Sequence, residues 1–228
     1  MAKADEGKRV RKMLDKLSGM YPDAVTALEY GSTFELLVAV ILSAQCTDQQ
    51  VNKITAELFK KYNQPEDFAA LEWEELAREI KGCGLYRNKS RFIVNTSRIL
   101  VEKHRSQVPS EREALEALPG VGRKTANVVM NVAFDKPVMP VDTHVFRTSR
   151  RLGLSSGKTP AAVEKDLMQI IPAEKMGQIH HCLILHGRQL CRARNPRCPE
   201  CDLAELCSSA DSDIFMGRNT EDRIQKTE

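Results

Sequence analysis

The chain has 228 residues, of which 42% are hydrophobic, so it can bury a sizeable core as one large domain or two small ones. Its 34 basic and 31 acidic residues give a net charge of +3, which is too balanced to indicate a nucleic-acid partner by itself. The longest apolar run, residues 36–42, is far too short to span a membrane. Seven cysteines in a large chain without a signal-peptide pattern predict a reducing compartment, not a disulfide framework.

Apolar side chains with a period of 3.6 residues predict helices through the first half of the chain. The segments with this period are residues 10–17, 48–59, 72–80 and 88–100, and we interpret the apolar run of residues 36–42 as a core helix. Ser32 and Glu35 form a capping-box pattern before that run. We expect the first helix to pack on the C-terminal part of the chain.

Helix signals also mark the second half. Ser110 and Glu113 form another capping-box pattern, which predicts the start of a helix. Thr159 and Pro160 match an N-cap and the first helical position, and Pro172 predicts the start of a further helix. No segment alternates with the period of a strand, so the predicted fold class is all-α.

Residues 118–144 read LPGVGRKTANVVMNVAFDKPVMPVDTH and contain the most informative pattern of the chain. Pro119, Gly120 and Gly122 interrupt two apolar periodic segments, which predicts a helix, a hairpin and a second helix. The second helix should begin near Arg123. Its unpaired N–H groups and the positive end of its dipole suit a phosphate.

Lys124 and Asp142 are the candidate chemical groups of this pattern. Lys124 stands in the first turn of the second helix, where the dipole and partial burial would favour a neutral, nucleophilic amine. The ordinary alternative is a solvated surface lysine. Asp142 stands where it would cap a helix that starts at Thr143, and capping alone is a sufficient reason for an aspartate there.

Four cysteines have the spacing C-x6-C-x2-C-x5-C, namely Cys191, Cys198, Cys201 and Cys207. This spacing brings four thiolates into one loop of 17 residues. Structural zinc is one interpretation, but such sites usually use two short knuckles, and this loop has one. An iron–sulfur cube tolerates the wider spacing. Four arginines could balance its negative charge, namely Arg188, Arg192, Arg194 and Arg197.

Two further groups could be mistaken for metal ligands, the histidines His180, His181 and His186 and the cysteines Cys46, Cys83 and Cys182. The histidines lack a spacing that places two of them on one helix face for a metal. We interpret one cysteine, Cys182, as a core residue and the other two as loop residues.

The hairpin, the lysine, the aspartate and the cysteine loop together resemble the endonuclease III family of the helix-hairpin-helix DNA glycosylase superfamily. The resemblance runs from about Arg9 to Cys207. It implies two lobes, with a cleft that holds the lysine and the aspartate. One lobe is a six-helix domain, residues 25–136, and the other is an iron–sulfur cluster domain, residues 1–24 and 137–207. The polar composition of residues 208–228 predicts a mobile tail.

The same resemblance implies functional residues. The catalytic lysine and aspartate of the family fall on Lys124 and Asp142, and the four cysteines of the loop become ligands of a [4Fe–4S] cluster. The implied DNA-binding residues are Gln45 in LSAQCTD, Leu85 in GLYRNK, Pro119, Gly120, Val121, Gly122, Arg123 and His144. Without the resemblance, a polar residue at a helix end and a leucine that anchors a loop would explain the first two.

The implied function is base-excision repair. A glycosylase of this kind removes oxidised pyrimidines from duplex DNA and cleaves the abasic site by β-elimination through a lysine Schiff base. Its partner is double-stranded DNA with damaged pyrimidines or abasic sites, with no membrane. We expect a monomer that is cytoplasmic and nucleoid-associated. Two alternatives stay open, an adenine-mismatch glycosylase, which typically lacks the lysine, and a non-catalytic DNA-binding iron–sulfur protein.

Overall fold

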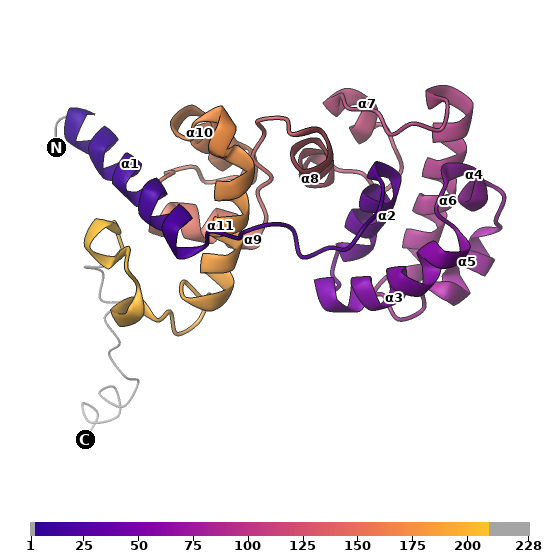
Figure 1. The fold of residues 1–228 in the computed structure, drawn as a ribbon, viewed down its shortest axis with the longest axis horizontal. Helices are drawn as coiled ribbons and strands as arrows, with labels where there is room; N and C mark the ends of the chain where they lie inside the picture. Colours follow the sequence, from indigo (N-terminus) through magenta and orange to yellow (C-terminus); the bar gives the residue numbers. More distant parts are fainter. Residues whose placement is uncertain (1–2, 210–228) are drawn as a thin grey trace, which may run out of the picture. The chain divides into compact units, whose positions relative to one another are not determined.

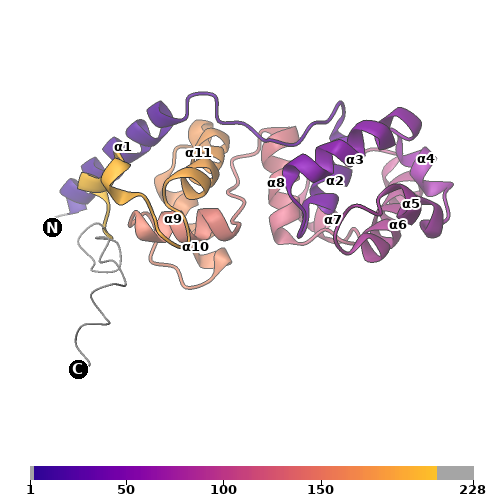
Figure 2. The same cartoon turned by 90° about the horizontal axis from the view of Figure 1, so that it is seen from below.

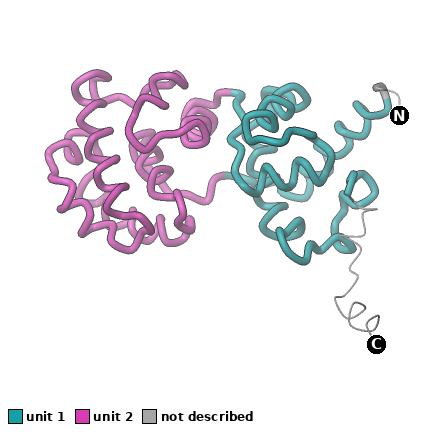
Figure 3. Tube along the Cα trace, turned by 180° about the vertical axis from the view of Figure 1, so that it is seen from behind, with its two compact units in different colours: residues 1–25, 137–228 teal, residues 26–136 magenta. Residues whose placement is uncertain are grey.

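The computed structural model describes residues 3–209, which contain helices and no strand, so the all-α prediction is confirmed. The chain divides into two compact units, residues 26–136 and the flanking segments 1–25 and 137–228 (Figure 3). Of the predicted mobile tail, all but the first two residues lie outside the described part. No helix of that part is long and apolar enough to cross a membrane.

The unit of residues 26–136 is a bundle around one apolar helix (Figure 1). Its helices are α2 Thr33–Ser43, α3 Asp48–Lys61, α4 Pro65–Ala69, α5 Trp73–Glu79, α6 Tyr86–His104, α7 Arg112–Glu116 and α8 Arg123–Phe134. In α2, every residue from Phe34 to Leu42 except Glu35 is buried, because this helix packs against α3, α6 and α8. The short helices α4 and α5 both pack on α6.

Local signals explain most helix starts in this unit, with one error. Ser32 caps α2 by accepting a hydrogen bond from the N–H of Glu35 at 3.1 Å, as predicted. The predicted cap at Ser110 is wrong. Its hydroxyl contacts the carboxylate of Glu111, the actual N-cap of α7, and the helix therefore begins at Arg112.

The second unit combines the N-terminal helix with the C-terminal third of the chain. Its helices are α1 Lys3–Met20, α9 Thr143–Arg151, α10 Pro160–Ile170, η1 Ala173–Lys175, α11 Met176–Gln189, η2 Cys198–Glu200 and η3 Ala204–Leu206. Thr159 caps α10 by accepting from the N–H of Ala162 at 3.2 Å, as predicted. Pro172 precedes the short η1 and not α11 directly, so the prediction at that proline is only approximate.

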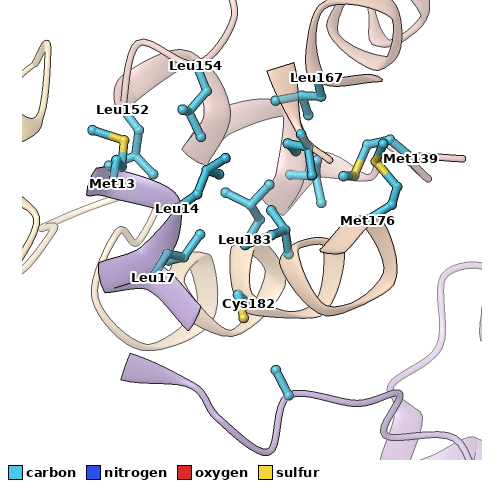
Figure 4. Close-up of a cluster of buried hydrophobic side chains, with 14 of the residues drawn as sticks. Met13, Leu14, Leu17, Met139, Leu152, Leu154, Leu167, Met176, Cys182 and Leu183 are labelled. Atoms are coloured by element: carbon cyan, nitrogen blue, oxygen red, sulfur yellow. The ribbon is translucent and has the colours of Figure 1, made fainter. Parts of the chain in front are cut away.

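Helix α1 lies beside α11 in both views, which confirms that the first helix packs on the C-terminal part (Figures 1 and 2). Met13, Leu14 and Leu17 of α1 enter a core with Leu152 and Leu183 (Figure 4). Each fully buried side chain of this kind contributes about 1.5–3 kcal/mol. This core fixes the helices from which the cysteine loop departs.

Candidate functional site

The turn between α7 and α8 is held against α6. Gly120 has φ +78°, and a Cβ at this position would lie 2.8 Å from the Cβ of Phe92. The Thr96 hydroxyl donates to the carbonyl oxygen of Pro119 at 2.9 Å, while Val121 is buried. The predicted helix-hairpin-helix is therefore present, and α6 fixes the position of its turn.

The N-terminus of α8 presents cations to solvent. Its N-cap is Gly122, which brings no side chain to cap the first turn. That turn contains Arg123 and Lys124, both exposed, and no acidic residue. Our expectation that Lys124 is partly buried is wrong, because Lys124 is the second residue of α8 and is exposed at the helix end.

Asp142 begins α9 in the other unit. Its Oδ1 accepts a hydrogen bond from the N–H of Val145 at 2.7 Å, so the predicted capping role is confirmed. The side chain is half-buried. Two residues later, the Nδ1 atom of His144 lies 3.2 Å from Nη2 of Arg147, which also donates to the carbonyl oxygen of Gly187 at 2.8 Å.

Gln45 and Leu85 share an unusual backbone conformation. Their φ angles are 54° and 57°, in the left-handed region that residues other than glycine rarely adopt. Both side chains are exposed, and Leu85 retains 54% of its accessible surface. A left-handed backbone at a residue other than glycine is strained and occurs at functional sites and at helix C-caps, where Arg105 and Asp135 adopt it in this chain. The two residues lie in neighbouring loops, since a Cβ on Gly84 would lie 3.0 Å from the carbonyl oxygen of Gln45.

Lys89 was not predicted as a site residue, although it lies in the GLYRNK segment. It is 3% exposed, and its Nζ donates to the carbonyl oxygen of Leu42 at 2.7 Å. This bond ties the first turn of α6 to the last turn of α2, and so it holds together the helix ends that carry Leu85 and Gln45. Burial lowers the pKa of Lys89.

The four loop cysteines line one small, mainly apolar cavity. Its other lining residues are Leu152, His186, Leu190, Arg197 and Ala204. All seven cysteines of the chain are free. Within residues 3–209, no group of three or more His, Cys, Asp or Glu side chains is arranged to hold a single metal ion. Four thiols around a shared cavity fit a polynuclear cluster, whose ligands are several ångströms apart.

The arginines around this cavity match only in part those that we predicted. Arg151 directs Nη1 at the sulfur of Cys191, 3.7 Å away, and donates to the carbonyl oxygen of Arg192 at 2.6 Å. Arg197 lines the cavity, but its guanidinium is paired with the carboxylate of Glu200. Arg151 could not be chosen from the sequence, because it lies in α9, 40 residues before the cysteine that it faces.

His186 also contacts the cysteine loop, although its sequence spacing gave no metal prediction. Its Nε2 lies 3.8 Å from the sulfur of Cys201, and its Nδ1 lies 3.2 Å from the hydroxyl of Tyr21. Burial lowers the pKa of His186 to about 4. The imidazole is therefore neutral at pH 7 and can donate one N–H, either to sulfur or to the hydroxyl oxygen.

Comparisons with known proteins agree with this architecture. The family model described as "HhH-GPD superfamily base excision DNA repair protein" matches residues 38–173. Endonuclease III of Bacillus subtilis is 50% identical over 201 residues, which are 88% of this chain and 92% of the relative. Endonuclease III of Escherichia coli K12 is 49% identical over 196 residues, which are 86% and 93% of the two chains.

Solved structures give the same result. A trapped covalent endonuclease III–DNA intermediate matches with a TM-score of 0.85 and 48% identity, over 90% of this chain and 96% of that chain. A non-covalent endonuclease III–DNA complex also has a TM-score of 0.85, with 45% identity over 96% and 99% of the two chains. These matches do not favour either alternative, the adenine-mismatch glycosylase or the non-catalytic iron–sulfur protein. The chain therefore belongs to the HhH-GPD superfamily of base excision DNA repair proteins and, within it, to the endonuclease III family of DNA glycosylases with AP lyase activity.

Proposed function

We propose that this enzyme removes oxidised pyrimidines from duplex DNA and then cleaves the strand at the abasic site. The observation that carries the proposal is the amine of Lys124, exposed in the first turn of the helix that follows the hairpin. A lysine there can form a covalent bond with the sugar, whereas a purely hydrolytic glycosylase needs no amine. One solved relative is a trapped covalent endonuclease III–DNA intermediate, which supports this chemistry.

The hairpin is proposed to hold the DNA backbone. The turn from Pro119 to Gly122 leads into the N-terminus of α8, where the first N–H groups of a helix suit a phosphate, and no carboxylate in the first turn of α8 repels it. Arg123 adds an exposed cation beside that turn. His144 is proposed as a further DNA contact at the start of α9. Phosphate contacts of this kind set the register of the enzyme without reading the base.

Gln45 and Leu85 are proposed to occupy the space that a flipped nucleotide leaves in the duplex. A flipped base costs a few kcal/mol of stacking and pairing, and side chains inserted in its place recover part of this cost. Leu85 offers an exposed apolar side chain, and Gln45 offers an amide that can pair with the orphaned base. Both side chains are exposed, and both stand on left-handed backbone.

The proposed reaction has two stages. The amine of Lys124 attacks C1′ of the damaged nucleoside, and the base leaves with the electrons of the glycosidic bond. The carboxylate of Asp142 stabilises the positive charge that develops on the sugar. The sugar ring then opens to an imine, which acidifies C2′. Loss of a C2′ proton expels the 3′ phosphate and breaks the strand.

The cysteine loop is proposed to bind a [4Fe–4S] cluster through Cys191, Cys198, Cys201 and Cys207. The free thiols line one cavity, and a guanidinium faces one of the sulfurs, as an anionic group requires. Bound there, such a cluster would fix the loop and supply no step of base removal. We further propose that the protein acts as a monomer on cytoplasmic, nucleoid DNA.

A nicking assay tests the proposed substrate. End-labelled duplexes contain a thymine glycol, an abasic site, an adenine opposite 8-oxoguanine, or no damage. We expect cleavage of the first two, with products of β-elimination, and no reaction with the last two. Base release from the adenine mismatch without strand cleavage, together with an intact thymine glycol duplex, would contradict the proposal.

A further inference from the structure

A pair of thiols connects the two loops that carry Gln45 and Leu85. The sulfur atoms of Cys46 and Cys83 lie 3.8 Å apart, although 37 residues separate the two cysteines in the chain. Neither cysteine belongs to the loop of residues 191–207, and the reaction proposed above uses neither. The proposed function therefore does not explain why the two thiols lie close together.

The close approach of the two loops brings the two thiols together. A Cβ on Gly84 would lie 3.0 Å from the backbone carbonyl oxygen of Gln45, and one on Gly82 would lie 2.7 Å from Nε2 of the Gln50 side chain. Glycines on both sides of Cys83 thus allow its loop to approach residues 45–50 closely. The packing of this unit imposes the contact between the thiols.

The two thiols differ in their access to solvent. Cys46 is half-buried, whereas Cys83 is 2% exposed. Burial, and then the neighbouring Cys46, raise the pKa of Cys83 to about 12, while the cation of Lys89 lowers it. A reagent from solvent therefore reaches Cys46 first. Cys83 is placed to react second, with a partner that is already beside it.

We propose that Cys46 and Cys83 are a redox modification site that forms a reversible disulfide by exchange with a small-molecule disulfide. The sulfur of Cys46 attacks the reagent, forms a mixed disulfide and releases one small thiol. The sulfur of Cys83 then attacks that of Cys46 and releases the second. The protein dithiol loses two electrons and two protons, which convert the reagent disulfide into two thiols. Formation of the bond shortens the sulfur separation from 3.8 Å to about 2.05 Å.

Such a bond would act on the residues next to it. Cys46 follows Gln45 directly, and Cys83 lies two residues before Leu85, so the disulfide would tether both left-handed positions. This consequence rests on the proposed insertion of Gln45 and Leu85 into the duplex. A displacement of about 1 Å at a positioning residue can lower a rate on the order of 100-fold. We expect oxidation to slow cleavage of a thymine glycol duplex by about 10-fold to 100-fold.

Peptide mapping tests the bond itself. The cluster-loaded protein is incubated with oxidised glutathione, digested without reduction and analysed by mass spectrometry, while visible absorbance checks that the iron–sulfur chromophore is unchanged. We expect one cross-linked species that contains Cys46 and Cys83 and lacks two hydrogen atoms, and dithiothreitol should separate it. Cys182→Ser is the matched control that keeps the cross-link, and Cys46→Ala should lose it. Persistent glutathione on Cys46, or two unmodified thiols, would overturn the proposal.

Cleavage rates test the tether separately. The oxidised wild type should be slow on thymine glycol and recover with dithiothreitol, while Cys46→Ala should keep its rate after the same treatment. An unchanged cleavage rate of the fully cross-linked protein would show that the disulfide does not regulate cleavage. If the reduced protein cleaves no damaged duplex, the proposed function fails, but the peptide map still decides whether the disulfide forms.

Discussion

Asp142 combines a structural and a chemical task in one side chain. One carboxylate oxygen accepts the N–H of Val145 at 2.7 Å and so caps α9. A capped carboxylate is held in one orientation, and its second oxygen is left to face a developing positive charge. The capping role that explains this aspartate by itself is therefore compatible with the proposed catalytic role.

Two substitutions separate these tasks. Asp142→Asn keeps an oxygen for the cap and loses the negative charge, whereas Asp142→Ala loses both. We expect both variants to release damaged base at least about 100-fold more slowly. Only Asp142→Ala should also lose stability, by about 1 kcal/mol. Single-turnover base release and denaturant unfolding measure the two effects, and equal stability of the variants would contradict the cap.

Leu85 should act on the duplex and not on the sugar chemistry. Leu85→Ala removes an exposed apolar side chain from a left-handed position, so folding should change little. We expect a larger loss of rate on a paired thymine glycol than on an abasic site, because an abasic site has no base to extrude. Parallel time courses on the two duplexes measure this difference. An equal loss of rate on both duplexes would contradict the proposed insertion of Leu85.

Two of the residues that the sequence did not identify, Lys89 and His186, share one property. Lys89 is polar but lies on the same helix face as the buried residues Ile93 and Thr96. Likewise, His186 lies on the face of Cys182 and Leu183. A polar side chain within an apolar stripe must find a buried partner, so the periodicity could have singled out both. Their partners, a carbonyl on α2 and a cysteine of the loop, depend on tertiary packing and could not be predicted locally.

Helix α6 links two parts of the candidate DNA-binding surface. Its N-cap is Leu85, and further along the helix Phe92 and Thr96 hold the hairpin turn. Packing of α4 and α5 on the same helix leaves it little freedom. One rigid element thus fixes the separation between the exposed leucine and the hairpin.

Two glycines of the hairpin should differ in their tolerance of a methyl group. Gly120 has φ +78° and lies against Phe92, so Gly120→Ala should destabilise the protein by at least about 1–2 kcal/mol and weaken DNA binding. Gly122 has φ −94°, and a Cβ there meets nothing within 4 Å. Gly122→Ala is therefore the matched control and should keep its stability. Thermal unfolding and binding to an abasic duplex measure both, and equal melting temperatures would contradict the account of the turn.

Helix starts were predictable where the cap is a local side-chain hydrogen bond. The prediction was wrong where the helix has no such bond. Ser32, Thr159 and Asp142 cap the helices that the sequence assigned to them. Ser110 matched the same pattern, but the neighbouring Glu111 takes its hydroxyl as a partner. Helix α4 has only five residues, which is too short for an apolar period to be visible.

The N-terminal helix and the cysteine loop stabilise each other across the whole length of the chain. Arg9 donates to the carbonyl oxygens of Leu152 and Leu206 at 3.0 and 2.6 Å, and Lys16 donates to that of Asp202 at 3.0 Å. The four thiols occupy the end of the same unit. A metal centre bound there would therefore stabilise the unit to which α1 belongs.

Metal analysis tests this dependence. We expect the purified protein to be brown and to contain iron and acid-labile sulfide. Cys198→Ser should lower the iron content and the melting temperature, whereas Cys182→Ser, which changes a core cysteine of the same unit, should keep its iron. Stoichiometric zinc without iron after anaerobic purification would contradict the cluster.

Borohydride trapping decides whether Lys124 forms a covalent bond with DNA. An imine between protein and sugar is reduced by borohydride to a stable adduct, which migrates more slowly on a denaturing gel. On an abasic duplex, we predict an adduct with the wild type and with the control Lys136→Gln, whose lysine follows α8 and pairs with Glu111. Lys124→Gln should give neither adduct nor strand cleavage. An adduct that persists in Lys124→Gln at the wild-type yield would contradict the assignment of the chemistry to this hairpin.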